Sequence, residues 1–189
     1  MTNKVYLLPG IAALIVAVLH PIYWISIVSF TASNGALRTD LGLLDGLYVV
    51  LATLTIVVYY SLRKILNEHC EYHGVDTLIT IIVYLSAALF VLFFVVGIFF
   101  SHTSQLPMSI AFPTMLVIVG AMDLMLGIQL HRDSDHLPGL VKAFAVVILI
   151  NGICSLSLIF SGLSLVLFPV AALILALMFL RKPEVLEFV

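Results

Sequence analysis

The residues in this sequence best suited to chemistry are a few polar groups that interrupt long apolar segments. They are the imidazole of His20, the carboxyls of Asp45 and Asp123, and the amide of Asn151. Ionisable groups at membrane depth are costly, because hydrocarbon solvates charge poorly, and they often mark functional sites. We therefore treat these four residues as candidates for binding a cation, relaying a proton or fixing the packing of helices.

His20 and Asp45 form the first candidate pair. They lie in neighbouring apolar segments that are joined by a short loop, and the sequence predicts both in the same half of the membrane. A histidine beside an aspartate could bind a cation, relay a proton or respond to pH. The simpler interpretation is that Asp45 lies at the wet interface beside Arg38. The aromatic residues one turn away would then be an ordinary interfacial belt: Tyr23, Trp24 and Tyr48.

Asp123 is predicted to lie deeper, between Gly120 and Gly127, and its segment carries no basic residue at similar depth. A carboxyl in this position must find a partner or stay protonated. Asn151, near the middle of the next segment, is the obvious neutral partner. The pair could be a proton or cation site at the bundle centre, or an interhelical hydrogen bond worth about 1 kcal/mol that only fixes packing.

Four further histidines lie in two polar segments between apolar ones. His69 and His73 are four residues apart, a spacing that puts two imidazoles on one face if the segment is helical, and His131 and His136 lie near aspartates. Imidazole and carboxylate are suitable ligands for Zn²⁺ and similar ions, so a divalent metal site is one hypothesis. Solvated polar loops with incidental histidines are the simpler account.

A b-type haem requires two histidines on facing helices at equal depth. His20 and His102 are the nearest approach to this arrangement, but His102 is predicted in a loop beyond the third apolar segment. No cofactor is therefore favoured. Hydrolase, metalloprotease and phosphate-binding motifs are also absent from the sequence, which leans against an enzyme.

The composition of the chain indicates the environment that surrounds these polar groups. Of 189 residues, 63% are hydrophobic and only 10% are charged. The mean hydropathy is +1.25. A soluble domain of this size could not hide that much apolar surface, so we expect an all-α polytopic membrane protein surrounded by lipid. The net charge of −2 and the lack of a basic patch argue against nucleic acid as a partner.

Six segments are long and apolar enough to cross a bilayer core, which takes roughly 20 residues each. The stretch 140–180 is too long for one crossing and must turn back, most simply at 161–164. We expect a single transmembrane domain over residues 1–189, a six-helix bundle with short loops and helices at about 5–30, 41–62, 77–100, 108–130, 140–160 and 162–180.

The basic residues predict the orientation, because cytoplasmic loops carry an excess of Lys and Arg. With the N-terminus inside, seven of the eight basic residues fall on the cytoplasmic side and only Arg38 lies outside. Six crossings then place both termini in the cytoplasm. The compact loops suggest an inner (cell) membrane.

Small residues predict which helix faces meet, because helices in lipid pack through close backbone contact. Gly42 and Gly46 form a Gly-x-x-x-Gly pair, and Gly120 and Gly127 flank Asp123. These positions and the sparse polar content favour a non-catalytic accessory subunit or scaffold that associates with itself or with another membrane protein. A small transporter or channel for a proton, cation or small solute, using the four intramembrane residues, is the alternative. A metal- or haem-dependent membrane enzyme is a third.

Overall fold

The computed structural model describes residues 4–34, 43–100, 106–157 and 159–181, with side chains for 6–27, 29, 46–91, 114–133, 135–157 and 159–181. These parts are helical apart from the short connections, and they contain no strand. The helices are α1 (Lys4–Asn34), α2 (Leu43–His69), α3 (Asp76–Phe100), α4 (Leu106–Arg132), α5 (Gly139–Leu156) and α6 (Ser164–Leu180), with 3₁₀ turns η1 (Ser134–His136) and η2 (Ser161–Leu163). The all-helical prediction is confirmed.

Five helices contain stretches long and apolar enough to cross a membrane, namely α1, α2, α4, α5 and α6. In α3, the stretch Asp76–Val91 within the described residues is apolar but shorter. Apolar side chains also cover much of the outer surface, including Leu8, Tyr84 and Val166. Such a surface is stable in lipid and not in water, which indicates a multi-pass membrane protein.

Several helix ends differ from the predicted spans, and two of them have a clear physical reason. α2 continues to His69, seven residues beyond the predicted end, because polar residues at helical spacing sustain it: Lys64 pairs with Glu68 one turn away. α5 ends earlier than predicted, at Leu156. The Ser157 hydroxyl donates to the Cys154 carbonyl and accepts the Phe160 N–H, so this side chain replaces the backbone bonds that would extend the helix.

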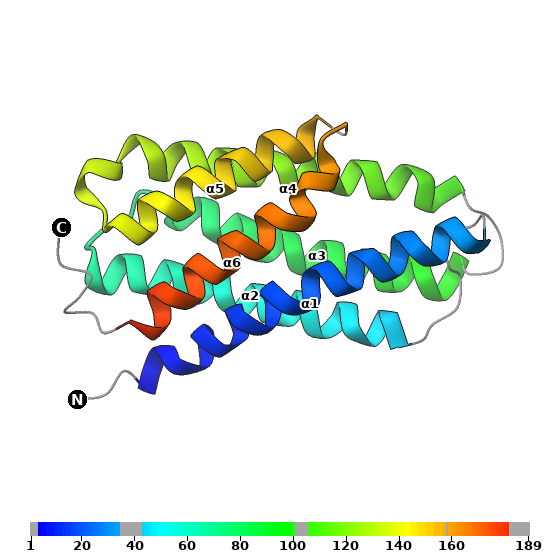
Figure 1. Cartoon of the computed structure of the whole chain (residues 1–189), viewed down its shortest axis with the longest axis horizontal. Coiled ribbons are helices and arrows are strands. Elements are labelled where there is room, and N and C mark those ends of the chain that lie inside the picture. Colours follow the sequence, from blue (N-terminus) through cyan, green and yellow to red (C-terminus); the bar gives the residue numbers. More distant parts are fainter. Residues whose placement is uncertain (1–3, 35–42, 101–105, 158, 182–189) are drawn as a thin grey trace.

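The six helices form a closed ring in chain order. Each helix packs mainly against the helices before and after it, and α6 packs along α1 to close the ring. The contact between α4 and α5 and that between α6 and α1 are the most extensive among the described residues. In Figure 1 the α2–α3 and α4–α5 connections lie at the end of the bundle where α1 begins and α6 ends, which we call the terminal end.

A ring of six helices leaves space at its centre that side chains must fill. Towards the terminal end they fill it: Leu62, Leu66, Leu126 and Phe144 are almost completely buried in one continuous core. This core continues through Ile148 and Leu175, and among the described residues it does not extend into the other half of the bundle. The half of the bundle near the terminal end is therefore packed. We call the other half, where the described side chains leave space at the centre, the hollow half.

Candidate functional site

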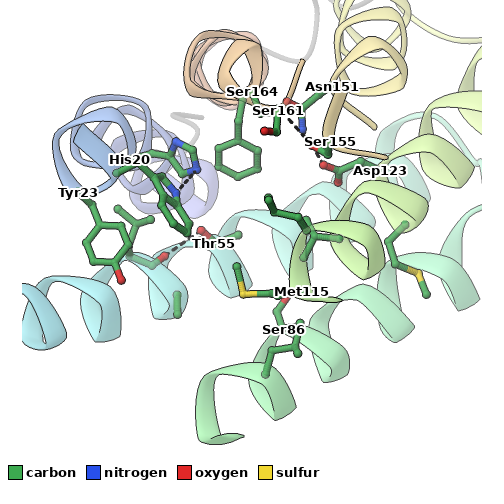
Figure 2. A pocket seen from close by; sticks show the side chains of 18 of the residues that line it. His20, Tyr23, Thr55, Ser86, Met115, Asp123, Asn151, Ser155, Ser161 and Ser164 are labelled. Atoms are coloured by element: carbon green, nitrogen blue, oxygen red, sulfur yellow. Dashed lines mark hydrogen bonds between the residues drawn. The ribbon is translucent and has the colours of Figure 1, made fainter. Parts of the chain in front are cut away.

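The hollow half contains a cavity of about 340 Å³ that is lined by side chains from all six helices. Figure 2 shows it between α1, α2 and α4, with Met115 and Ser86 on one side and Ser161 and Ser164 on another. The wall is mainly Leu, Met, Ile and aromatic residues, and polar groups are concentrated at a few positions. Ligand pockets usually begin at about 300 Å³ and have this mixture of apolar wall and sparse polar groups.

Asp123 on α4 is a buried polar group of the cavity, 2% exposed. The Asn151 side chain on α5 donates its Nδ2–H to Asp123 Oδ2 over 2.8 Å. The Tyr59 hydroxyl on α2 donates to Asp123 Oδ1 over 3.4 Å, which is long for a hydroxyl bond. Asn151, the neutral partner that the sequence predicted, therefore does contact Asp123. Residues of three helices, α2, α4 and α5, meet at this carboxyl.

Glycines explain why Asp123 and Asn151 meet. A Cβ at Gly127 would lie 2.6 Å from the Leu149 backbone, and one at Gly120 would lie 2.8 Å from Ser155 Cβ. Gly152 on α5 faces the backbone of Leu124 just as closely. Without side chains at these positions the two backbones approach directly, which brings the short Asn and Asp side chains within hydrogen-bonding distance. The glycines flanking Asp123 thus pack within this chain.

His20 lines the opposite side of the cavity, and its partners are aromatic. Trp24, one turn along α1, donates its indole N–H to His20 Nε2 over 3.1 Å. The imidazole packs on the Phe168 ring of α6, with 4.5 Å between ring centres. Beside them Tyr23 stacks on Tyr48 of α2. The aromatic residues predicted as an interfacial belt therefore line the interior, although Trp24 is only partly buried.

Several predicted contacts fall outside what is described. The side chain of Asp45 is not among the described ones, so the proposed His20–Asp45 pair stays a prediction, and Arg38, Gly42 and His102 lie outside the described residues. Gly46 is described. It is exposed on α2, with open space beyond the position of a Cβ.

One face of α2 was missed by the sequence reasoning. Tyr48, Thr55 and Tyr59 all line the cavity, and a further hydrogen bond joins Ser155 to Ser164 at 2.9 Å. The signal was present in the spacing, because residues 48, 52, 55 and 59 follow one helical face. Tyr48 was predicted as part of an interfacial belt and no role was predicted for Thr55 or Tyr59, so the alignment of this face with Asp123 was not expected.

The loop histidines are separated at the terminal end. α2 ends at His69, so His73 follows in a non-helical connection and the two imidazoles do not share a helical face as the spacing had suggested. His73 Nδ1 lies 3.1 Å from Asp76, and His131 and His136 are exposed. Within the residues that the structure describes, no three His, Cys, Asp or Glu side chains gather as a metal site would require.

The terminal end is instead held by a network of polar bonds between helix connections. The Tyr72 hydroxyl donates to Asp133 over 2.7 Å, and the Gln129 amide donates to the Gly74 carbonyl. Asp76 accepts from Arg63 in an ion pair of 3.1 Å. The bond from Tyr72 holds the pKa of Asp133 below its usual value, while partial burial and the same bond raise the pKa of Tyr72. The network closes the bundle beneath the core.

The cavity can therefore hold a small molecule between an aromatic wall and a buried carboxyl. Two unpaired polar atoms remain among the described residues lining it, His20 Nδ1 and Asn151 Oδ1. Buried polar groups are normally paired, so these two atoms are suited to a bound partner. Comparisons with protein-family models, with curated proteins and with solved structures found no match to this chain.

Proposed function

We propose that this protein is a small multi-pass transporter whose substrate, a largely apolar organic solute, binds in the cavity inside the helix ring. The observation that carries the proposal is the cavity itself, because helices that only pack against partners have no reason to leave about 340 Å³ open around a buried carboxyl. A void of this kind costs stability, since its lining loses contacts. Binding of a solute would offset that cost.

The character of the wall supports a solute over a hydrated ion. Leu85, Leu89, Met115 and Phe168 supply much of the lining. Ion-conducting routes carry rings of carbonyls or charges that replace the hydration shell. An apolar wall with one carboxyl suits an organic molecule that enters, binds and is released when the helices rearrange.

The membrane arrangement is part of the proposal. We infer six crossings with both termini in the cytoplasm of a cell (inner) membrane. The described basic side chains support this, because Arg63, Lys64, Arg132 and Lys142 all belong to helix ends or connections at the terminal end. Reporter fusions at Ser104 and at the C-terminus test the topology. They should report an external and a cytoplasmic location, respectively, and the reverse result would overturn it.

The cavity is tested by asking whether it retains a solute. Purified protein is incubated with a protein-free cell extract and washed, and the released small molecules are identified by mass spectrometry. Val119→Phe places a ring in the cavity. Val117→Phe is the matched control, because it adds the same ring to the exposed surface of α4 outside the cavity. A molecule retained by the wild type and Val117→Phe but lost from Val119→Phe would support the proposal and supply the substrate for uptake assays in proteoliposomes. Identical profiles from all three proteins would contradict it.

An accessory subunit remains the second candidate, and one observation favours it. Gly46 is a small, exposed position on α2 that no described atom covers. Such positions allow a second helix to approach closely. If Gly46→Leu dissociates an oligomer or a co-purifying protein while the retained solute is unchanged, the two functions coexist on different faces.

A further inference from the structure

The polar end of the cavity accepts hydrogen bonds and carries no fixed positive charge in the described part of the chain. Asp123 receives one bond on each carboxylate oxygen, from Asn151 and Tyr59. An ionised carboxylate offers about four acceptor positions, so two remain. The Asn151 Oδ1 atom, on a residue that is 2% exposed, is a further acceptor without a partner. Acceptor positions of the Asp123–Asn151 pair therefore remain unused.

Both groups that contact Asp123 donate to it, which is the arrangement that a charged carboxylate needs. A buried carboxylate without a counter-charge is costly in a membrane. Among the described residues no Lys or Arg lines the cavity or pairs with Asp123. The carboxyl therefore either stays protonated or takes its counter-charge from a ligand in the adjacent cavity.

His20 does not supply the charge. Its Nε2 atom accepts the Trp24 indole N–H, and a ring nitrogen that accepts a hydrogen bond belongs to a neutral imidazole. The Phe168 ring covers the imidazole face. This side of the cavity therefore offers aromatic surface and one unpaired donor, His20 Nδ1–H, and its aromatic rings are compatible with a cationic ligand.

We infer that the substrate is a small amphipathic monocation, a protonated amine with an apolar body, whose ammonium binds Asp123 and Asn151 Oδ1. This inference rests on the proposed function of the same cavity. An ammonium is a compact donor of three hydrogen bonds, which matches the unused acceptors. A 150 Å³ cavity holds benzene, so about 340 Å³ suits roughly a dozen non-hydrogen atoms. The apolar body would lie against Phe168 and the leucines.

The test compares three probes of nearly equal size and different charge: 4-phenylbutylamine, 4-phenylbutan-1-ol and 4-phenylbutyrate. Trp24 is the only tryptophan in the chain and lines the cavity, so its fluorescence reports occupancy directly. Titrations are made on the full-length protein in nanodiscs at pH 7. Val119→Phe corrects for probe that only partitions into lipid, and Val117→Phe is its matched control.

The wild type should bind the amine at least about tenfold more tightly than the alcohol, and the carboxylate should bind most weakly, because charge-assisted bonds are the stronger ones. Asp123→Asn keeps the shape and still accepts from Asn151, and it should abolish the preference for the amine. Val117→Phe, on the exposed face of α4 outside the cavity, should retain it. The wild-type comparison of charges stands even if the Asp123 variant does not fold.

Equal binding of amine and alcohol by the wild type would overturn the inference of a cation. It would leave the proposed function intact if both probes lost affinity in Val119→Phe. A preference for amine that survives in Asp123→Asn would also overturn the inference, because the charge would then be recognised elsewhere. Failure of all three probes to bind would contradict this ligand class, while the solute-retention experiment decides the proposed function separately.

Discussion

At the scale of single residues, the molecule depends on how Asp123 is satisfied. A buried carboxyl left with only one long hydrogen bond destabilises the folded state more than an apolar residue in its place would. The reason is that a polar atom without a partner bears its full desolvation penalty. Asn151 is therefore more important to Asp123 than the strength of one hydrogen bond suggests. The effect of an Asp123 variant on stability can therefore be measured apart from its effect on ligand binding.

We predict that Asn151→Leu and Asp123→Leu each lower the free energy of unfolding by about 1–2 kcal/mol, because each leaves a buried partner unpaired. The double variant should recover about 1 kcal/mol of the summed loss, since both polar groups are then gone. Equilibrium unfolding in mixed micelles measures the four proteins of the cycle. Pairing Asp123→Leu with Ser86→Ala instead should give no coupling; equal coupling in the two cycles would mean that Asn151 is not the specific partner.

A second residue-scale prediction concerns the Tyr72–Asp133 bond outside the membrane. The bond lowers the pKa of Asp133, and partial burial together with the bond raises that of Tyr72, so the stabilisation is full between the ordinary pKa values of about 4 and 10. It is lost as pH falls through the folded pKa of Asp133, or as pH rises through that of Tyr72. Tyr72→Phe should therefore lower Tm by a constant amount from pH 5 to 9, and the difference should shrink below about pH 4. A gap that persists at pH 3 would show that packing, not the bond, is lost.

At the scale of elements, the glycines divide into two kinds. Gly120, Gly127 and Gly152 lie against the backbone of the neighbouring helix, whereas Gly46 on α2 meets no described atom within 4 Å. The distinction could not be made from the sequence, because all of them occupy similar apolar contexts at helical spacing. It depends on which neighbour each helix receives in the ring.

We predict that Gly127→Ala destabilises the protein by about 1–3 kcal/mol, because its methyl group would overlap the backbone of α5 at Leu149. Gly46→Ala is the matched control. It meets no atom within 4 Å and should be neutral or stabilising by up to about 1 kcal/mol, since alanine favours helix. Thermal unfolding of both variants in one detergent measures the contrast. Equal losses would show that the α4–α5 contact is not as close as described.

Much of the helical framework could be predicted from hydropathy alone, because crossing lengths and turn signals are properties of local sequence. The Asp123–Asn151 pairing was also predictable, since few polar groups were available to satisfy a deep carboxyl. The cavity was not. Its existence depends on which side chains fill the centre of a ring, and the face of α2 that carries Thr55 and Tyr59 becomes meaningful only when α4 lies opposite.

At the scale of the whole molecule, the two cysteines provide a test of orientation. Cys154 is buried in α5, and Cys70 lies in the α2–α3 connection at the terminal end, where burial raises the pKa of its thiol. In a Cys154→Ser background, a membrane-impermeant maleimide should label Cys70 only from the cytoplasmic side. The reaction should be slow at pH 7 and accelerate as pH rises above about 8.5, because the thiolate is the reactive form. Rapid labelling of intact cells from outside would invert the proposed topology.

The short α5–α6 hairpin has a consequence for the surrounding membrane. Its helices have 18 and 17 residues, or about 26 Å at 1.5 Å per residue, whereas α1 has 31 residues. A hydrocarbon core of roughly 30 Å exceeds the hairpin by a few Å, and such hydrophobic mismatch makes the bilayer thin beside it. The η2 turn forms part of the cavity wall, so headgroups and water would be drawn towards the cavity at this side. Lipid chain length would thereby set how easily a solute exchanges between the cavity and the membrane interface.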